Sequence, residues 1–302
     1  MHFKDIQRVP GDPILGLIEA YAVDPNPNKF DLGVGVYKDA MGLTPVLRSV
    51  KLAEQRLLDN QTTKTYIGGH GQARFGALLC ELVMGKNSSL IAQNRVGATQ
   101  APGGTGALRL CADFIAHSLP GRGIWLSDPT WPIHESIFGA AGLKVSHYPY
   151  VGSDNRLHVE AMLATLKQVP HGDVVLLHAC CHNPTGFDLS HDDWRKVLEV
   201  VRSRNLLPLI DFAYQGFGDG LEQDAWPCVC SPKPCQSCSS PVPARRISAC
   251  TASAPAPCWS APTTLKSCLM YAASCPPRRA TCGRTHRIMV QPSLPRSSAI
   301  PS

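Results

Sequence analysis

The 302-residue sequence predicts an α/β fold in which a mostly parallel sheet is covered by helices. Two observations lead to this prediction. Between about residues 46 and 211, segments with helical spacing of apolar residues alternate with short apolar runs. These runs are apolar throughout, which is typical of strands buried on both faces of a parallel sheet. Ligands of such sheets bind beyond the carboxyl ends of the strands, so the loops after the strands are the expected location of a site.

Three helices are expected first. Residues 46–58 have apolar side chains at helical spacing, residues 73–84 repeat the pattern before Gly85, and residues 104–119 form a longer apolar segment that ends at Pro120-Gly121. Four strands then alternate with three helices. The strands are expected at residues 123–126, 144–148, 173–179 and 206–211, and the helices between them at residues 133–140, 159–168 and 191–204.

The composition changes after Trp226. Residues 1–226 contain 20 basic and 23 acidic residues, a net charge of −3, whereas residues 227–302 contain nine basic residues and no acidic one. The same segment contains 13 of the 26 prolines and nine of the 13 cysteines, with few large apolar residues, so we expect it to be largely disordered. The overall charge of +6 therefore gives no reason to expect a nucleic-acid partner for the folded part.

The rest of the composition suggests a cytoplasmic protein. The first residues lack the apolar core of a secretion signal, and no apolar run approaches the roughly 20 residues of a membrane span, so no membrane partner is expected. The first 226 residues contain four cysteines in apolar stretches, which we expect to be buried free thiols rather than a disulfide framework: Cys80, Cys111, Cys180 and Cys181.

Two loops could hold a phosphorylated ring by its phosphate and by one face. Gly103, Gly104 and Thr105 open the helix at residues 104–119, where glycines and free N–H groups make a cup for an anion. Ordinary capping of a helix explains the same glycines. Trp131 follows the first strand and offers a flat face for a ring, although it could equally pack on the edge of the sheet.

Two further loops could hold the polar edge of such a ring. Asn183 could donate a hydrogen bond from a rigid turn, although Asn-Pro is also a common turn opener. Asp211 ends an apolar strand, and Tyr214 follows three residues later; the alternative is an Asp that caps the next turn. His178 and His182 flank Cys180-Cys181, but no second ligand pair accompanies them, so no metal site is predicted.

The combination is more specific than its members. An anion cup, an aromatic face, an Asn donor and an Asp with a nearby Tyr, each placed after a strand, describe a pocket for a phosphorylated aromatic ring. Pyridoxal 5'-phosphate is such a ring, and it needs a carboxylate at its ring nitrogen to act as an electron sink.

Residues 12–226 resemble the class I aspartate and aromatic-amino-acid aminotransferases, nearly without gaps. Six strings match in order: Asp12-Pro13-Ile14-Leu15-Gly16-Leu17, Gly33-Val34-Gly35-Val36-Tyr37-Lys38-Asp39, Thr63-Lys64-Thr65-Tyr66, Gly103-Gly104-Thr105-Gly106-Ala107-Leu108-Arg109, His182-Asn183-Pro184-Thr185-Gly186 and Asp211-Phe212-Ala213-Tyr214-Gln215-Gly216.

The resemblance implies a pyridoxal-phosphate-dependent transferase of fold type I and a role for each site residue. Gly103, Gly104 and Thr105 would bind the cofactor phosphate, and Trp131 would stack on the ring and contact the substrate carboxylate. Asn183 and Tyr214 would hydrogen-bond the phenolic oxygen of the ring, with Asn183 also near the substrate, and Asp211 would pair with the ring nitrogen. Gly35 would lie against the substrate, and Tyr66 would reach the phosphate of the other subunit of a homodimer.

The implied reaction is an EC 2.6.1 transamination, which moves an amino group from aspartate or an aromatic amino acid to 2-oxoglutarate. The implied domain organisation places an N-terminal arm and part of the small domain at residues 1–45. Most of the large cofactor-binding domain would follow at residues 46–226, so the small domain would be incomplete. Residues 227–302 would be the tail.

The family's central lysine is missing. It forms the Schiff-base link to the cofactor and lies in a string like Ser-Lys-Asn-Phe-Gly-Leu-Tyr, which does not occur here, and the later arginines that grip substrate carboxylates are missing as well. Residues 244–253, Ala-Arg-Arg-Ile-Ser-Ala-Cys-Thr-Ala-Ser, can be spelled GCT CGA AGA ATT TCG GCC TGT ACC GCG AGC. Without the first two bases this reads Ser-Lys-Asn-Phe-Gly-Leu-Tyr-Arg-Glu. Two later stretches, residues 265–275 and 281–291, become family-like in the same frame. We infer a frameshift close to Trp226, and we expect the chain as written to lack transaminase activity.

Two other interpretations remain open. The front part could be a non-catalytic scaffold whose Cys-rich tail, with Cys228, Cys230, Cys235 and Cys238, binds zinc. Alternatively, the chain could fail to fold stably because its sheet and small domain are unfinished.

Overall fold

A computed structural model describes residues 13–30, 39–229 and 267–270. The helices among these residues are α1 (Pro13–Val23), α2 (Arg48–Asn60), α3 (Ala73–Met84), α4 (Ser89–Ala92), α5 (Gly103–Ser118), α6 (Ile133–Ala140), α7 (Val159–Leu166), α8 (His191–Ser203) and α9 (Trp226–Val229). The strands are β1 (Gly97–Gln100), β2 (Ile124–Asp128), β3 (Val145–Pro149), β4 (Val174–His178), β5 (Leu207–Asp211) and β6 (Ser267–Met270).

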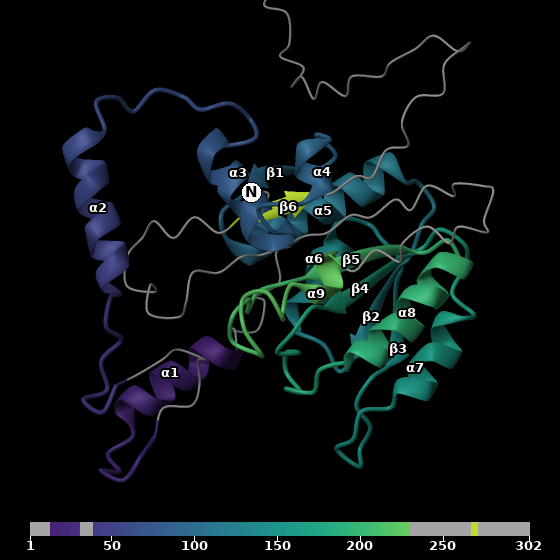
Figure 1. Cartoon of the computed structure of the whole chain (residues 1–302). Coiled ribbons are helices and arrows are strands. Elements are labelled where there is room, and N and C mark those ends of the chain that lie inside the picture. The colour runs from purple at the N-terminus through teal and green to yellow at the C-terminus, as the bar shows by residue number, and fades with distance from the viewer. Residues whose placement is uncertain (1–12, 31–38, 230–266, 271–302) are drawn as a thin grey trace, which may run out of the picture.

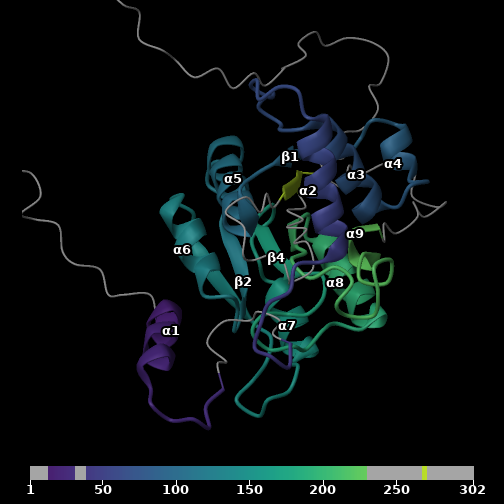
Figure 2. The same cartoon turned by 90° about the vertical axis from the view of Figure 1, so that its left-hand side faces the viewer.

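The predicted parallel sheet is confirmed. Strands β2, β3, β4 and β5 form one sheet in the order β3-β2-β4-β5, and every neighbouring pair is parallel. The α/β alternation places α5 and α6 on one face and α7 and α8 on the other (Figures 1 and 2). All carboxyl ends therefore lie at one edge, where β2, β4 and β5 lead into the loops that the sequence singled out.

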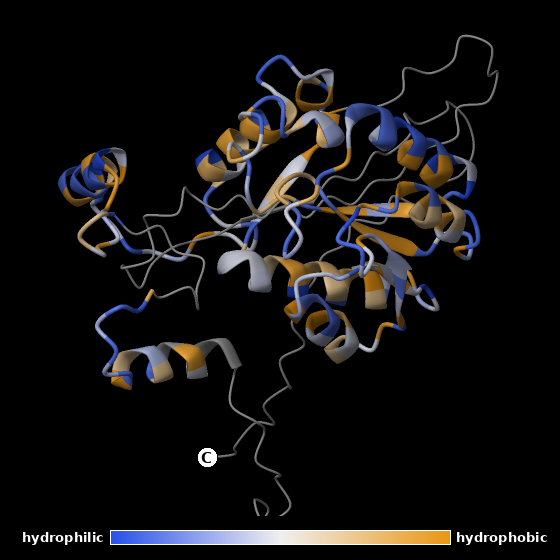
Figure 3. Cartoon of the chain, turned by 90° about the horizontal axis from the view of Figure 1, so that it is seen from below, coloured by the Kyte–Doolittle hydropathy of each residue, from blue (hydrophilic) through white to orange (hydrophobic). Residues whose placement is uncertain are grey.

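Side chains of β4 alternate between two apolar cores. Val175 and Leu177 pack into the core that includes residues of α3, α7 and α8, whereas Val174 and Leu176 pack into the core that includes residues of α5 and α6. Figure 3 shows these strands as hydrophobic segments between the helices. Because both faces are covered, every position of the strand is buried except its last, and the apolar runs of the sequence are continuous.

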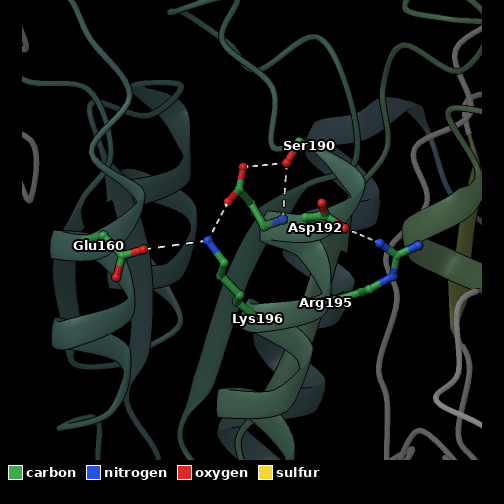
Figure 4. Close-up of polar contacts among 6 residues, drawn as sticks. Glu160, Ser190, Asp192, Arg195 and Lys196 are labelled. Atoms are coloured by element: carbon green, nitrogen blue, oxygen red, sulfur yellow. Dashed lines mark hydrogen bonds and ion pairs between the residues drawn. The ribbon is translucent and has the colours of Figure 1, made fainter.

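Helix α8 begins at His191, as predicted, because Ser190 caps it. The Ser190 hydroxyl oxygen accepts a hydrogen bond from the Asp193 N–H at 3.2 Å. Lys196 then lies 3.3 Å from the Asp193 carboxylate and 3.6 Å from the Glu160 carboxylate of α7 (Figure 4). These exposed charges add little stability, but they link the outer surfaces of the two helices.

Helix α2 forms where the sequence predicts a helix, shifted by two residues, but its apolar side is not buried. None of its residues is buried, and Leu52, Leu57 and Leu58 are exposed. Figure 1 shows α1 and α2 standing apart from the sheet and its covering helices. Within the described residues, the apolar face of α2 thus has nothing to pack against.

The predicted tail is described only in two short pieces. Pro227–Val229 belong to α9, and Ser267–Met270 form β6, which pairs antiparallel with β1 from Gly97↔Met270 to Gln100↔Ser267. Neither piece was predicted individually, since the sequence indicates only that the tail is largely disordered. The remaining tail, including Cys230, Cys235 and Cys238 of the zinc interpretation, lies outside the described residues.

The cysteines of the front part are free thiols, as predicted. Cys80, Cys111 and Cys180 are buried, whereas Cys181 is only half-buried because it sits at a turn. In the part of the chain that the structure describes, no helix has the length and apolarity needed to cross a membrane. The domain boundaries at residues 45 and 226 stay a prediction.

Candidate active site

The carboxyl ends of β4 and β5 lie in register. His178, the last residue of β4, is paired with Asp211, the last residue of β5, and the Ala179 N–H donates to the Asp211 carbonyl oxygen at 2.8 Å. Asp211 is only 6% exposed, so it is more deeply buried than the partly buried carboxylate that the sequence predicts. A buried carboxylate is costly unless it has partners, and the structure provides one.

That partner is His134, in the first turn of α6. Its Nε2 atom lies 3.0 Å from Asp211 Oδ2, and its Nδ1 atom lies 2.8 Å from the Thr130 hydroxyl. Because an ionised carboxylate can only accept, the His134 Nε2–H donates to Asp211 and the Thr130 hydroxyl donates to Nδ1. The side chain of Asp211 is therefore oriented by a hydrogen-bonded chain that starts in the loop after β2.

His178 lies beside this chain without a hydrogen bond of its own. Both ring nitrogens are buried and unpartnered, and the ring lies 5.4 Å from that of His134 and 4.2 Å from that of His182. Burial lowers the pKa of His178 to about 4, opposed in part by the Asp211 charge. The imidazole is therefore neutral at pH 7.

His182 fixes the turn that follows β4. Its Nε2 atom lies 2.9 Å from the Ser127 hydroxyl and its Nδ1 atom 2.8 Å from the Thr185 hydroxyl, while the ring stacks on Tyr150 at 4.0 Å. Burial, followed by the neighbouring His178, lowers the pKa of His182 to about 3. The His182 ring is therefore neutral, and its two hydrogen bonds fix the position of the residue immediately before Asn183.

The same turn is anchored by Asp188. Its carboxylate accepts the Cys181 N–H at 2.7 Å and the His182 N–H at 2.9 Å. Cys181 has a φ of 49°, a left-handed conformation that is unusual for a residue other than glycine. The turn before Asn183 is therefore imposed by its partners rather than by local preference.

Asn183 and Tyr214 lie side by side, and their shared role at a ring oxygen stays a prediction. Their side chains are hydrogen-bonded, and this bond opposes the rise in the pKa of Tyr214 that burial and the Asp211 charge cause. Tyr214 is 38% exposed and Asn183 is half-buried, so the pair remains open to a ligand. Asp211, Asn183 and Tyr214 together present one buried anion and two accessible polar groups at the ends of β4 and β5.

Trp131 packs against the protein core, and its role as a flat face for a ring stays a prediction. It is half-buried and packs against the core below α5 and α6, and its ring meets the His134 ring edge-on at 5.2 Å. The Trp therefore lies next to the residue that orients Asp211.

The glycine-rich loop opens α5 directly after β1. Gly103 has a φ of +73°, which favours glycine, while Gly103 and Gly104 are half-buried and Thr105 is exposed. The first N–H groups of a 16-residue helix have no partner inside the helix, so the loop retains donors for an anion.

Of the two remaining predicted residues, the structure describes only Tyr66. Tyr66 is 105% exposed, so it does not pack against the other site residues that the structure describes. Gly35 lies outside the described residues.

Sequence reasoning missed His134 and the hydroxyls that surround the histidines. One signal was available: Thr130 and His134 are four residues apart, across a loop and the first turn of a helix that follows a strand. The link from His134 to Asp211 spans 77 residues and has no local signal.

The arrangement fits a flat, phosphorylated, nitrogen-containing ring. A buried carboxylate is available for a cationic ring nitrogen, Asn183 and Tyr214 are available for a ring oxygen, and the start of α5 is available for a phosphate. The orphaned ring of His178 shows that the polar interior around Asp211 is not complete by itself.

Comparisons with known proteins give a family match and several close relatives. The family model described as aminotransferase class I and II matches residues 27–239. Over 225 residues the chain is 75% identical to an aromatic-amino-acid aminotransferase of Pseudomonas aeruginosa, covering 74% of this chain and 56% of that protein. Over 224 residues it is 49% identical to an aspartate aminotransferase of Escherichia coli strain K12, covering 74% and 57%.

Solved structures give the same result. An aromatic-amino-acid aminotransferase from Burkholderia pseudomallei, covalently bound to pyridoxal phosphate, superimposes with a TM-score of 0.82 at 36% identity, covering 91% of this chain and 66% of that one. The chain therefore spans little more than half the length of the curated relatives it matches, at 56% and 57%.

Proposed function

Because this chain belongs to the class I and II aminotransferase family, we propose that it is the cofactor-binding part of a pyridoxal-5'-phosphate-dependent transaminase of the EC 2.6.1 type. The observation that carries the proposal is the buried Asp211 carboxylate, held by His134 at 3.0 Å and flanked by the Asn183–Tyr214 pair. The substrates would be an amino acid and a 2-oxo acid. Relatives named for aspartate and for aromatic amino acids support an amino donor of either class, and 2-oxoglutarate is the acceptor that the family resemblance implies.

Each residue of the site would contact a different part of the cofactor or substrate. Asp211 would pair with the ring nitrogen, and Asn183 and Tyr214 would hydrogen-bond the phenolic oxygen. Trp131 would cover one face of the ring and, with Asn183 and Gly35, contact the substrate. Gly103, Gly104 and Thr105 would hold the phosphate. When bound, the protonated ring would withdraw electrons from the substrate carbon next to the amino group.

His134 would act as a positioning residue. Its Nε2–H fixes one carboxylate oxygen of Asp211, and Thr130 fixes the ring of His134 in turn. A hydrogen bond to the charged carboxylate stabilises the ionised form, which is the form that pairs with a cationic ring nitrogen.

A homodimer is part of this proposal. Tyr66 and the leucines of α2 are exposed in the single chain, although an amphipathic helix normally buries its apolar face. A second copy would cover this face and bring Tyr66 to its phosphate. The free thiols favour a cytoplasmic location.

The cofactor would be held without a covalent bond, and the chain as written would not transaminate. The string that contains the family's lysine is absent, as described above, and no lysine among the described residues is buried. Affinity would therefore come from the phosphate, ring-nitrogen and ring-oxygen contacts alone.

Titration of the purified chain with pyridoxal phosphate, followed by its absorbance and by tryptophan fluorescence, tests the proposal. We expect saturable binding that falls at least tenfold in Asp211→Asn and is unchanged in the exposed control Asp154→Asn. Borohydride treatment followed by mass spectrometry should leave no cofactor on any lysine. Equal affinity in both variants would refute the assigned site, and a reduced adduct would refute noncovalent binding.

A further inference from the structure

A second kind of ligand fits the group around Asp211. His134, His178 and Asp211 come from α6, β4 and β5, and each offers a ligand atom within 4.8 Å of the other two. His134 and Asp211 are buried, whereas His178 is half-buried with both ring nitrogens inaccessible to solvent. Two imidazoles and one carboxylate are the ligand types that zinc binds in proteins.

The ring nitrogens of His178 give a second, independent indication that this group binds a ligand. Both of its ring nitrogens are inaccessible to solvent and have no hydrogen-bond partner. Native proteins rarely leave a buried polar atom unpaired, and a metal ion is one of the explanations for such an atom.

We propose that His134, His178 and Asp211 bind one divalent cation of the zinc type in the cofactor-free chain. Ligand atoms on a tetrahedral zinc lie roughly 3.3–3.5 Å apart, given Zn–N distances of about 2.0–2.1 Å. On metal binding, the distance of 3.0 Å between His134 Nε2 and Asp211 Oδ2 would therefore increase by a few tenths of an ångström. The distance from the ligand nitrogen of His178 to these two atoms, at most 4.8 Å, would shorten by less than about 1.5 Å.

Thr130 makes this change possible at His134. In the metal-free site the His134 Nε2–H donates to Asp211. To bind a metal through Nε2, the ring must carry its proton on Nδ1, which lies 2.8 Å from the Thr130 hydroxyl. A hydroxyl can donate or accept, so Thr130 reverses its role and provides the outer hydrogen bond that metal-bound histidines usually have. His134 loses no proton in this exchange.

The metal would compete with the cofactor, a consequence that rests on the proposed function. Asp211 cannot ligate a cation and pair with a cationic ring nitrogen at the same time. Zinc would therefore raise the apparent Kd for pyridoxal phosphate, and pyridoxal phosphate would raise the apparent Kd for zinc.

Metal binding should be measured on the full chain, free of cofactor, after its accessible cysteines have been blocked with iodoacetamide. Blocking removes the accessible thiols as ligands, while buried thiols, Cys228 among them, are protected, so the cobalt spectrum reports on any thiolate that still binds. Zinc binding is followed by calorimetry, and the ligand type by the absorption of bound cobalt(II). We expect one ion per chain and a cobalt spectrum without a sulfur-to-metal charge-transfer band.

Three variants decide the assignment. His178→Gln should weaken zinc binding at least tenfold, Thr130→Val should weaken it about tenfold through the outer hydrogen bond, and the exposed control His171→Gln should leave it unchanged. Binding by His178→Gln as tight as that of the parent, or a thiolate band with cobalt, would overturn the site. If His178→Gln does not fold, as judged by circular dichroism, unchanged affinity of Thr130→Val overturns it instead.

The metal-site proposal and the cofactor-site proposal can each be refuted without refuting the other. The metal titrations contain no pyridoxal phosphate, so their outcome does not depend on cofactor binding. If both ligands bind and neither affects the affinity for the other, the cofactor site stands and the shared use of Asp211 is wrong.

Discussion

Asp211 and His134 are 77 residues apart in the chain, yet their side chains meet at 3.0 Å. The contact exists because α6 starts in the loop after β2, two strands from β5 in the sheet order β3-β2-β4-β5. The sheet thus brings a histidine from one loop to a carboxylate at the end of another strand. The orientation of the central anion depends on this contact.

Loss of the His134 contact should therefore weaken cofactor binding. In His134→Asn we expect the Kd for pyridoxal phosphate to rise about five- to thirtyfold, since a hydrogen bond to a charged group contributes about 1.5–3 kcal/mol and the site can relax in part. Glu135→Gln, the exposed neighbour on α6, is the matched control. A His134→Asn variant that binds like its control would show that Asp211 needs no positioning.

The Tyr214 hydroxyl should contribute less. Tyr214→Phe removes the partner of Asn183 and the proposed contact to the ring oxygen, so we expect a loss of affinity worth about 0.5–1.5 kcal/mol. Tyr21→Phe, far along the chain in α1, serves as the control. The melting temperature of Tyr214→Phe should barely change, because the side chain is partly exposed; a large drop would indicate a structural role.

Alkaline pH should destabilise the fold through two buried tyrosines. Tyr148 donates to the Leu176 carbonyl and Tyr150 to the Phe187 carbonyl, both at 2.7 Å, and burial is the main reason that the pKa of each phenol is raised. The unfolded chain loses these protons near pH 10, while the folded chain keeps them. Stability is therefore fully present below pH 10 and falls above it by about 1.4 kcal/mol per pH unit for each phenol.

Tyr150→Phe isolates one of these groups. Denaturant unfolding between pH 8 and pH 11 should show a shallower alkaline decline than in the parent, by about 1.4 kcal/mol per pH unit. At pH 8 the variant should be less stable by about 1 kcal/mol, because it lacks the bond to Phe187. Parallel curves for parent and variant would mean that Tyr150 titrates normally in the folded chain.

The apolar face of α2 should matter for association and not for the fold of one chain. Leu57→Glu is expected to leave the unfolding midpoint of the monomer unchanged and to abolish dimers in sedimentation experiments. Gln55→Glu, an exposed change on the same helix, should have no effect on either measurement. A monomeric parent chain would remove the basis for the dimer.

Substitutions in the buried core should affect stability far more than substitutions on the exposed face of α2. Trp194 is 2% exposed within the core beneath α8, so Trp194→Ala should cost about 3–5 kcal/mol of stability in urea unfolding. The same substitution at the exposed Leu58 should cost less than about 0.5 kcal/mol. Similar losses at the two positions would contradict the difference in burial.

The sequence predicted most of the sheet and the residues at its edge, for a physical reason. The strand at residues 174–178 is buried on both faces and therefore uninterruptedly apolar, and its end is marked by the first polar residues that follow. Asn183 and Asp211 occur at such ends, so their roles could be inferred. Asn183–Tyr214 and Asp211 came together as the parallel order of β4 and β5 requires.

Contacts between distant parts of the chain were not predictable in the same way. His134 looks like an ordinary helix residue, and nothing near it in the sequence points to Asp211. The unpartnered nitrogens of His178 are a property of its surroundings and not of its neighbours in the sequence. Helix α2 illustrates a different difficulty. Its sequence pattern predicts an apolar face, but the pattern does not tell whether that face is covered by the same chain.

Strand β6 has a consequence for how β1 is protected. Ladder pairing joins amide and carbonyl groups of the main chain, and it is largely indifferent to the side chains on the incoming strand. Ser267–Met270 can therefore shield β1 although they belong to a segment that does not resemble the family. A bare β1 would be an open template for strands of other molecules and a route to aggregation. Four residues from a distant part of the same polypeptide suffice to cap it.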